Sequence, residues 1–150
     1  MPSIKVAVID SGADPLSLRH AQLHHSLRIK RRSGRFRFRR CLTDPVGHGT
    51  ACVELIGRLA PAAQISSLAI TDEHGCFELE SLIQAIEWCI EKGIDVVSVS
   101  LGTTDSSRRA ELERVCTQAH AAGLVVIAAV HNDGLVSFPA HCESTIGVAS

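Results

Sequence analysis

Short runs of apolar, often β-branched residues alternate along this chain with stretches in which apolar residues recur every three or four positions. Five of the short runs predict β-strands, at residues 4–9, 64–70, 94–100, 124–129 and 145–149. Two of them, 94–100 and 124–129, are apolar at nearly every position, which is typical of strands covered on both faces. The alternation of strands and helices predicts an α/β domain with a three-layer, doubly wound, mostly parallel sheet.

Three segments between these strands carry a helical pattern. One has an apolar stripe and can end at Gly93, a second can begin at the cap Asp105 and end at Gly123, and a third runs from about residue 48 to residue 59. The stripe consists of Leu79, Leu82, Ile83, Ile86 and Ile90. We find no internal repeat and no interdomain linker, so a single domain is expected over residues 1–150.

Composition fits a globular protein of that size. The chain has 150 residues, of which 45% are hydrophobic, and a net charge of -1. This charge gives no general attraction to nucleic acid or to a membrane surface, and no apolar run reaches the roughly 20 residues of a membrane span. The composition is also apolar for a chain of this length, as if part of the surface were to receive a further layer.

Cysteine usage bears on the cellular compartment. Six cysteines are scattered without a Cys-x-x-Cys pair, and the first residues have no basic region or cleavage site of a signal peptide. We therefore expect free thiols in a reducing environment, and a cytoplasmic protein without a pro-segment. The eight histidines show no ligand spacing, so no metal site is predicted.

The segment from Arg28 to Arg40 differs from the rest in charge, because eight of its thirteen residues are Lys or Arg. Alternation of Arg and Phe from residue 35 to 39, together with the turn pair Ser33 and Gly34, predicts a basic hairpin. Two interpretations stay open: a docking surface for an acidic peptide or partner, and an edge hairpin whose arginines discourage strand addition. The shortness of the patch disfavours nucleic acid.

Two residues carry candidate chemistry. Asp10 ends the first apolar run, at the edge where open α/β sheets place their sites, although phosphate-binding and phospho-acceptor domains also have acids there. His48 lies between Gly47 and Gly49 at a predicted helix start, where the neutral imidazole that a general base requires is favoured. Taken alone, His48 fits a structural or capping role equally well.

Taken together, the motifs are more specific. The succession VAVIDSG, DPVGHGTA, IDVVSVSLG, VVIAAVHNDG, FPA and TIGVAS resembles the subtilisin-like serine proteases (subtilases) over essentially the full chain. The resemblance implies a subtilisin-like fold that is incomplete at its C-terminal side, so that residues 1–150 form a truncated peptidase domain with a basic hairpin insertion at about 28–40. It implies a serine endopeptidase, which hydrolyses peptide bonds of a peptide or protein substrate through an acyl-enzyme.

The resemblance also implies residue roles. Asp10 matches the triad aspartate that orients the histidine, and His48 matches the general base. Asn132 matches the asparagine whose amide donates to the oxyanion. The segment Ser100, Leu101 and Gly102 matches the extended strand that pairs with the substrate backbone. No cofactor is expected; calcium occurs in the family but cannot be assigned to residues here.

Three departures from the family pattern qualify these expectations. His131 stands where the family has a glycine before the oxyanion asparagine. Glu54 stands where the family has a small residue against the sheet, and a carboxylate there would be costly unless paired. No serine has the Gly-Thr-Ser-x-Ala context of the nucleophile.

Without that serine we expect the chain alone to be inactive, because triad members act as a unit. Three hypotheses follow. The chain is the N-terminal portion of a subtilase, with an uncovered apolar face and a tendency to self-associate; or it is half of a split enzyme completed by another chain; or it is a non-catalytic peptide-binding pseudoprotease.

Overall fold

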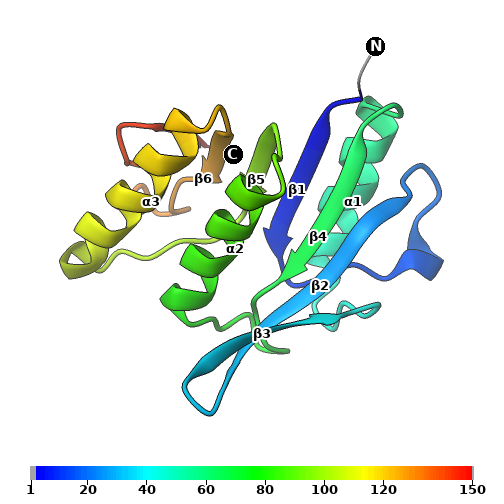
Figure 1. Cartoon of the computed structure of the whole chain (residues 1–150), viewed down its shortest axis with the longest axis horizontal. Coiled ribbons are helices and arrows are strands. Elements are labelled where there is room, and N and C mark those ends of the chain that lie inside the picture. The colour runs from blue at the N-terminus through cyan, green and yellow to red at the C-terminus, as the bar shows by residue number, and fades with distance from the viewer. Residues whose placement is uncertain (1–2, 150) are drawn as a thin grey trace.

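The computed structural model describes residues 3–149, in which seven strands form one sheet in the order β3-β2-β4-β1-β5-β6-β7 (Figure 1). The strands are β1 (Lys5–Asp10), β2 (Leu23–Arg32), β3 (Arg35–Arg40), β4 (Gln64–Ala69), β5 (Val96–Val99), β6 (Val125–Ala129) and β7 (Thr145–Val148). Neighbouring strands are parallel except for the antiparallel pair of β2 and β3. The predicted α/β class with a mostly parallel sheet is confirmed.

Helices cover both faces of this sheet. They are α1 (His48–Leu59), α2 (Leu79–Glu91) and α3 (Arg109–Ala121), with two short 3-10 turns at Pro15–Ser17 and Ser106–Arg108. Successive residues of a strand point to opposite faces of the sheet. The packing partners of successive β1 residues therefore show which helices lie on each face. Ala7 and Ile9 pack in the core cluster that contains α2 and α3, whereas Val8 packs with Val53 of α1. The three predicted layers are therefore present, with α1 behind the sheet in Figure 1.

The strand β2 was only partly predicted. It begins at Leu23, well before the basic segment, and pairs in parallel with β4 before it continues into the hairpin with β3. Its first residues, Leu-His-His-Ser, lack a clear alternation of apolar and polar residues, so periodicity gave no signal there. The basic hairpin is consequently an extension of an interior strand and not a separate ribbon.

One part of the sheet has no helix over it. α1 packs on β1 and β4, and the same face of β6 and β7 exposes Val125, Ile146 and Val148, which are 41%, 56% and 47% accessible. Their neighbours Val126 and Ala128 point to the other face and are buried against the α3 side. The apolar excess of the composition thus lies partly on an uncovered strip of the sheet.

Two further expectations concern the surroundings of the protein. Within residues 3–149 no helix is both long and apolar enough to cross a membrane. All six cysteines are free thiols in the structure. The cytoplasmic location stays a prediction.

Candidate active site

The last residue of β1 and the first residue of α1 meet at the carboxyl edge of the sheet. Nδ1 of His48 lies 2.8 Å from Oδ2 of Asp10. The aspartate side chain is only 7% exposed, whereas the imidazole is 59% exposed. Nε2 of His48 has no hydrogen-bond partner within residues 3–149, so a buried carboxylate orients a ring whose second nitrogen is open to a substrate.

Ser11 fixes the orientation of the Asp10 carboxylate. Oδ1 of Asp10 accepts hydrogen bonds from the Ser11 backbone N–H at 2.7 Å and from the Ser11 hydroxyl at 3.0 Å. The same hydroxyl accepts a bond from the Gly49 N–H at 3.1 Å. One oxygen of the carboxylate is therefore held by the β1 turn, and the other is left for His48.

Glycine at position 49 permits the close approach of α1 to β1. A Cβ placed on Gly49 would lie 2.2 Å from the carbonyl oxygen of Gly12 and 3.2 Å from the Cβ of Asp10. Gly12 itself has φ +122°, a conformation that side chains disfavour, and its own Cβ would lie 2.5 Å from the Thr43 carbonyl. Gly12 and Gly49 thus allow the close packing that sets the distance between the Asp10 carboxylate and the His48 imidazole.

Asp44 caps the start of α1, a role that the sequence analysis missed. Its carboxylate accepts from Gly47 N–H at 2.8 Å, from Thr50 N–H at 2.8 Å and from the Thr50 hydroxyl at 2.7 Å. Burial alone would raise the pKa of this carboxyl, but the hydrogen bonds from Thr50 and Gly47 outweigh it and hold the pKa below its ordinary value. An acidic residue just before a predicted helix start was the available signal.

Cys52 lies one turn after His48 on α1. Its Sγ is 3.8 Å from Nδ1 of His48 and 4.0 Å from Oγ of Ser100. Burial, with the nearby charge of Asp10, raises the pKa of this thiol and keeps it protonated. Asp10, His48 and Cys52 offer ligand atoms within 4.8 Å of one another, but Nδ1 already bonds the carboxylate. The absence of a cofactor stays a prediction, and calcium, which occurs in the family, is not assigned to residues here.

The predicted substrate segment leaves β5 beside this pair. Ser100 and Leu101 are half-buried and Gly102 is exposed. Among residues 3–149, none of the three takes part in a backbone hydrogen bond outside the regular elements, whereas Thr103 pairs with Phe138 in both directions. A Cβ on Gly102 would lie 2.5 Å from the Phe138 carbonyl, so a glycine is required there. The segment has free main-chain groups, as strand addition needs.

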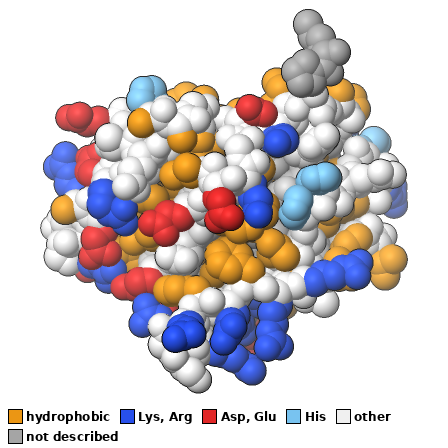
Figure 2. All heavy atoms as spheres, viewed as in Figure 1, with side chains coloured by type: hydrophobic (Ala, Val, Ile, Leu, Met, Phe, Trp, Pro, Cys, Tyr) orange, Lys and Arg blue, Asp and Glu red, His pale blue; other side chains and the backbone are white. Residues whose placement is uncertain are grey.

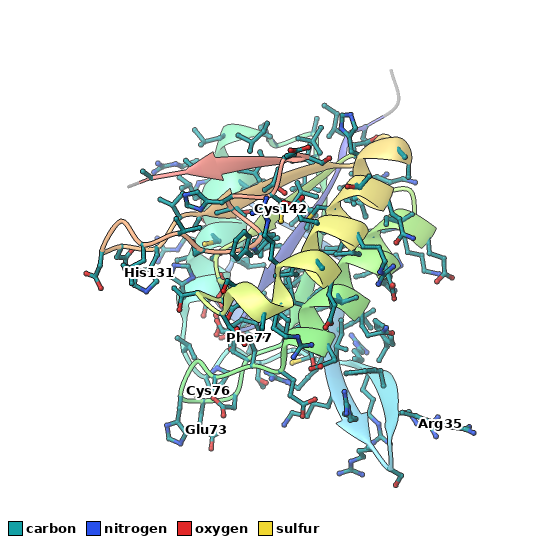
Figure 3. The ribbon with its side chains drawn as sticks, turned by 90° about the vertical axis from the view of Figure 1, so that its left-hand side faces the viewer. Arg35, Glu73, Cys76, Phe77, His131 and Cys142 are labelled. Carbon is teal, nitrogen blue, oxygen red and sulfur yellow. The ribbon has the colours of Figure 1, made fainter. Side chains whose placement is uncertain are left out.

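Asn132 lies on an exposed turn that follows β6, where Gly134 N–H donates to the His131 carbonyl at 2.9 Å. Nδ1 of His131 accepts from the Asp133 N–H at 3.2 Å, so this imidazole is bonded to its own turn. Figure 3 shows His131 on a loop that extends beyond the sheet. The Asn132 amide has no partner within residues 3–149; no contact links it to His48, and its oxyanion role stays a prediction.

Glu54 does not press against the sheet as the family comparison suggested. The buried residues of α1 are Gly49, Val53 and Gly57, and the Glu54 side chain is 26% exposed. Its carboxylate accepts from the backbone N–H groups of Arg19 and His20 and from the His20 ring. The expected cost is avoided because the carboxylate is paired outside the sheet contact.

This pairing predicts a pH effect on stability. The hydrogen bonds from the His20 backbone and ring lower the pKa of Glu54 from 4.5 to about 2. Because the folded-state pKa is the lower one, the stabilisation is complete above pH 4.5 and is lost as pH falls toward 2. We expect Glu54→Gln to lower Tm at neutral pH, with the difference from the unmodified protein shrinking between those pH values; thermal unfolding followed by circular dichroism measures it. Glu73→Gln, on an exposed loop, is the control, and an unchanging difference would contradict the assignment.

The fold and this edge define an α/β protein with an aspartate–histidine pair at the carboxyl end of a parallel sheet. The chain belongs to the subtilase family, whose model matches residues 2–150.

Similar proteins agree with this assignment. The chain is 34% identical over 160 residues to the minor extracellular protease Epr of Bacillus subtilis (strain 168), covering 99% of this chain and 23% of that protein. It is 32% identical to subtilisin E of the same organism over 167 residues, covering 99% of this chain and 41% of that protein. The chain thus spans less than half of either relative.

Among solved structures, a lanthipeptide protease has a TM-score of 0.79 and 22% sequence identity. The match covers 98% of this chain and 48% of that one. At this identity the likeness supports the fold alone, which is the subtilisin-like fold that the motifs implied.

Proposed function

We propose that this chain supplies the aspartate, the histidine and the substrate strand of a subtilisin-like serine peptidase. The observation that carries the proposal is the 2.8 Å contact between the buried Asp10 carboxylate and Nδ1 of the exposed His48 ring. A carboxylate in this position selects the tautomer with the proton on Nδ1 and leaves Nε2 as the base. Membership of the subtilase family supports the same chemistry.

In the proposed reaction Nε2 of His48 takes the hydroxyl proton of a serine as the serine oxygen attacks the peptide carbonyl. The imidazolium, stabilised by Asp10, returns that proton to the leaving amine when the C–N bond breaks, and an acyl-enzyme remains. Water repeats the sequence to release the acid. The main chain of residues 100–102 would align the substrate, and the Asn132 amide would donate to the oxyanion.

None of the serines near the candidate site has the Gly-Thr-Ser-x-Ala context of the family nucleophile. The Ser11 hydroxyl is committed to Asp10 and Gly49, and Ser137 is buried with its hydroxyl accepting from the His131 N–H. Ser100 lies at the substrate segment, 4.0 Å from the Cys52 sulfur. We therefore propose that a further segment of the same polypeptide, or a second chain, supplies the nucleophile. A Gly-Thr-Ser-x-Ala segment in the coding DNA after codon 150, in any forward frame, would identify the first source.

Labelling with a serine-directed fluorophosphonate tests the proposal. We expect no label on the chain alone, and label when it is joined to the downstream segment or mixed with the partner that carries the serine. The label should disappear in the His48→Ala variant, because the nucleophile loses its base. If no combination is labelled while peptides still bind, the protein is a non-catalytic peptide-binding module and the peptidase proposal is wrong.

A further inference from the structure

The β2–β3 hairpin presents six cationic side chains on one face. Residues directly opposite in an antiparallel pair share a face. The cross-strand pairs on this face are Arg28 with Arg39, Lys30 with Arg37, and Arg32 with Arg35. The alternate residues, among them Ile29 and Phe38, point to the other face, where Ile29 is buried against the core. Figure 2 shows Lys and Arg side chains gathered over the end of the molecule where Figure 1 places this hairpin.

Carboxylates do not pair with these cations at close range, although Lys30 is near enough to Asp72 to help lower the pKa of that carboxyl. Within residues 3–149 none of the six lies within ion-pair distance of a carboxylate, and the salt bridge on the hairpin, Arg31 with Glu78 at 3.4 Å, belongs to the opposite face. Like charges directly across a strand pair destabilise it. Three such pairs in succession on one face therefore lower the stability of the hairpin. An anion bound between them would offset this repulsion.

Protection of the sheet edge accounts for only part of this arrangement. Charges that discourage strand addition lie on strands with an unpaired edge. β3 has such an edge, and so does β2 beyond Arg28, where its pairing with β4 ends, but Arg28 itself lies between two paired strands. On the opposite face of the same hairpin an arginine is paired with a glutamate. Cations of this hairpin can therefore be neutralised by carboxylates, but those of the basic face are not.

The basic face lies beside the candidate active site. Arg28 is in register with Ala69, and Ala69 is in register with Asp10, so the side chains of Arg28 and Asp10 project on the same side of the sheet. The Arg28 guanidinium donates to the carbonyl of Ser11 at 3.3 Å and to that of Thr71 at 2.6 Å. Two strand spacings separate the Arg28 and Asp10 backbones, about 10 Å.

A groove lies on the basic face. It has a volume of about 390 Å³ and is lined by basic side chains of both strands and by residues 41–43, which lead into the loop before His48. Beyond Arg28, β2 continues for four residues, a further ~13 Å. At the tip, Arg35 extends away from the body of the molecule (Figure 3). The spacing of about 10 Å between the Arg28 and Asp10 backbones corresponds to about three residues of extended peptide.

We propose that this face binds a run of Asp or Glu residues in the peptide substrate, a few residues from the bond that is cleaved. The position of the cleaved bond relative to the acidic run rests on the proposed function. Binding of the acidic run to the basic face is independent of that function. Guanidinium groups bind carboxylates with paired hydrogen bonds, and an acidic run would neutralise the three cross-strand cation pairs. The substrate class is therefore peptides with an acidic stretch beside the cleavage site.

Binding of two labelled peptides to the full chain tests the proposal by fluorescence polarisation. The peptides are identical except that three Glu residues in one are Gln in the other. We expect the acidic peptide to bind more tightly by about tenfold, and Arg37→Gln with Arg39→Gln to remove that preference. Arg58→Gln with Arg114→Gln on the helices makes the same charge change away from the groove and should preserve it. The Tm of the hairpin variant should not fall, because it relieves repulsion between like charges.

Other outcomes would overturn the inference. One is equal affinity for the two peptides. Another is a preference for the acidic peptide that survives in the Arg37/Arg39 variant and also in a second variant, Lys30→Gln with Arg37→Gln. Tighter binding of a single-stranded RNA that displaces the acidic peptide would assign the face to nucleic acid instead. Fluorophosphonate labelling is independent of this test: label without acidic preference leaves the peptidase proposal intact, and acidic preference without label leaves only the docking surface.

Discussion

Replacing His48 by alanine in the assembled peptidase should lower kcat by roughly 10⁶-fold, the size of the effect that loss of the triad histidine has in subtilisin. The reason is geometric: Nε2 of His48 is the free nitrogen of a ring held at 2.8 Å from a buried carboxylate. Hydrolysis of a neutral peptide by the assembled peptidase, before any fluorophosphonate treatment, measures the effect. Because the ring is 59% exposed, Tm should change little.

The control for that variant is His74→Ala, on an exposed loop that is not part of the site. It should retain the activity of the unmodified protein. Retention of a tenth or more of the activity by the His48 variant would show that another group acts as the base.

The second large effect is expected from Gly49→Ala. Helix propensity alone would make alanine more stable than glycine by about 1 kcal/mol. The added Cβ, however, would lie 2.2 Å from the Gly12 carbonyl oxygen, and forcing such a contact typically costs about 1–3 kcal/mol or more. We expect a lower Tm and a loss of activity together, because α1 would be displaced from Asp10.

Ala51 lies at an exposed position of the same helix. Ala51→Gly therefore changes the helix propensity without changing a packing contact, and it should lower Tm only by the difference in propensity. Thermal unfolding and peptide hydrolysis are measured on both variants. An increase in Tm for Gly49→Ala, equal and opposite to the change for Ala51→Gly, would show that the close approach does not constrain the site.

The sequence contained enough to place the central part of the fold and the position of the acid–base pair. The apolar run that ends at Asp10 and the two glycines around His48 predict a strand end and a helix start, and parallel strands bring their carboxyl ends to one edge. The sequence could not reveal that the Ser11 hydroxyl bridges Asp10 and Gly49. These contacts depend on how closely α1 approaches β1, which no local pattern encodes.

The partners of Glu54 were hidden for a similar reason. The family pattern has a small residue against the sheet at this position, whereas in α1 it is Val53 that packs with Val8 and Ile65 of the sheet. Glu54 is adjacent to Val53 in sequence and about 100° away around the helix, so its carboxylate reaches Arg19 and His20 instead. The partners came from a segment whose path could not be predicted without the fold.

The position of β1 in the sheet has a consequence for synthesis of the protein. Val6 of β1 lies between Ile65 of β4 and Val96 of β5, so both neighbours of this strand are made much later than the strand itself. At about 5–20 residues per second, β1 waits roughly five to twenty seconds for its second partner, whereas a hairpin such as β2–β3 forms in microseconds. Until β4 and β5 have been made, the apolar strand that bears Asp10 therefore has open edges on the nascent chain, and chaperones that protect these edges should limit aggregation during synthesis.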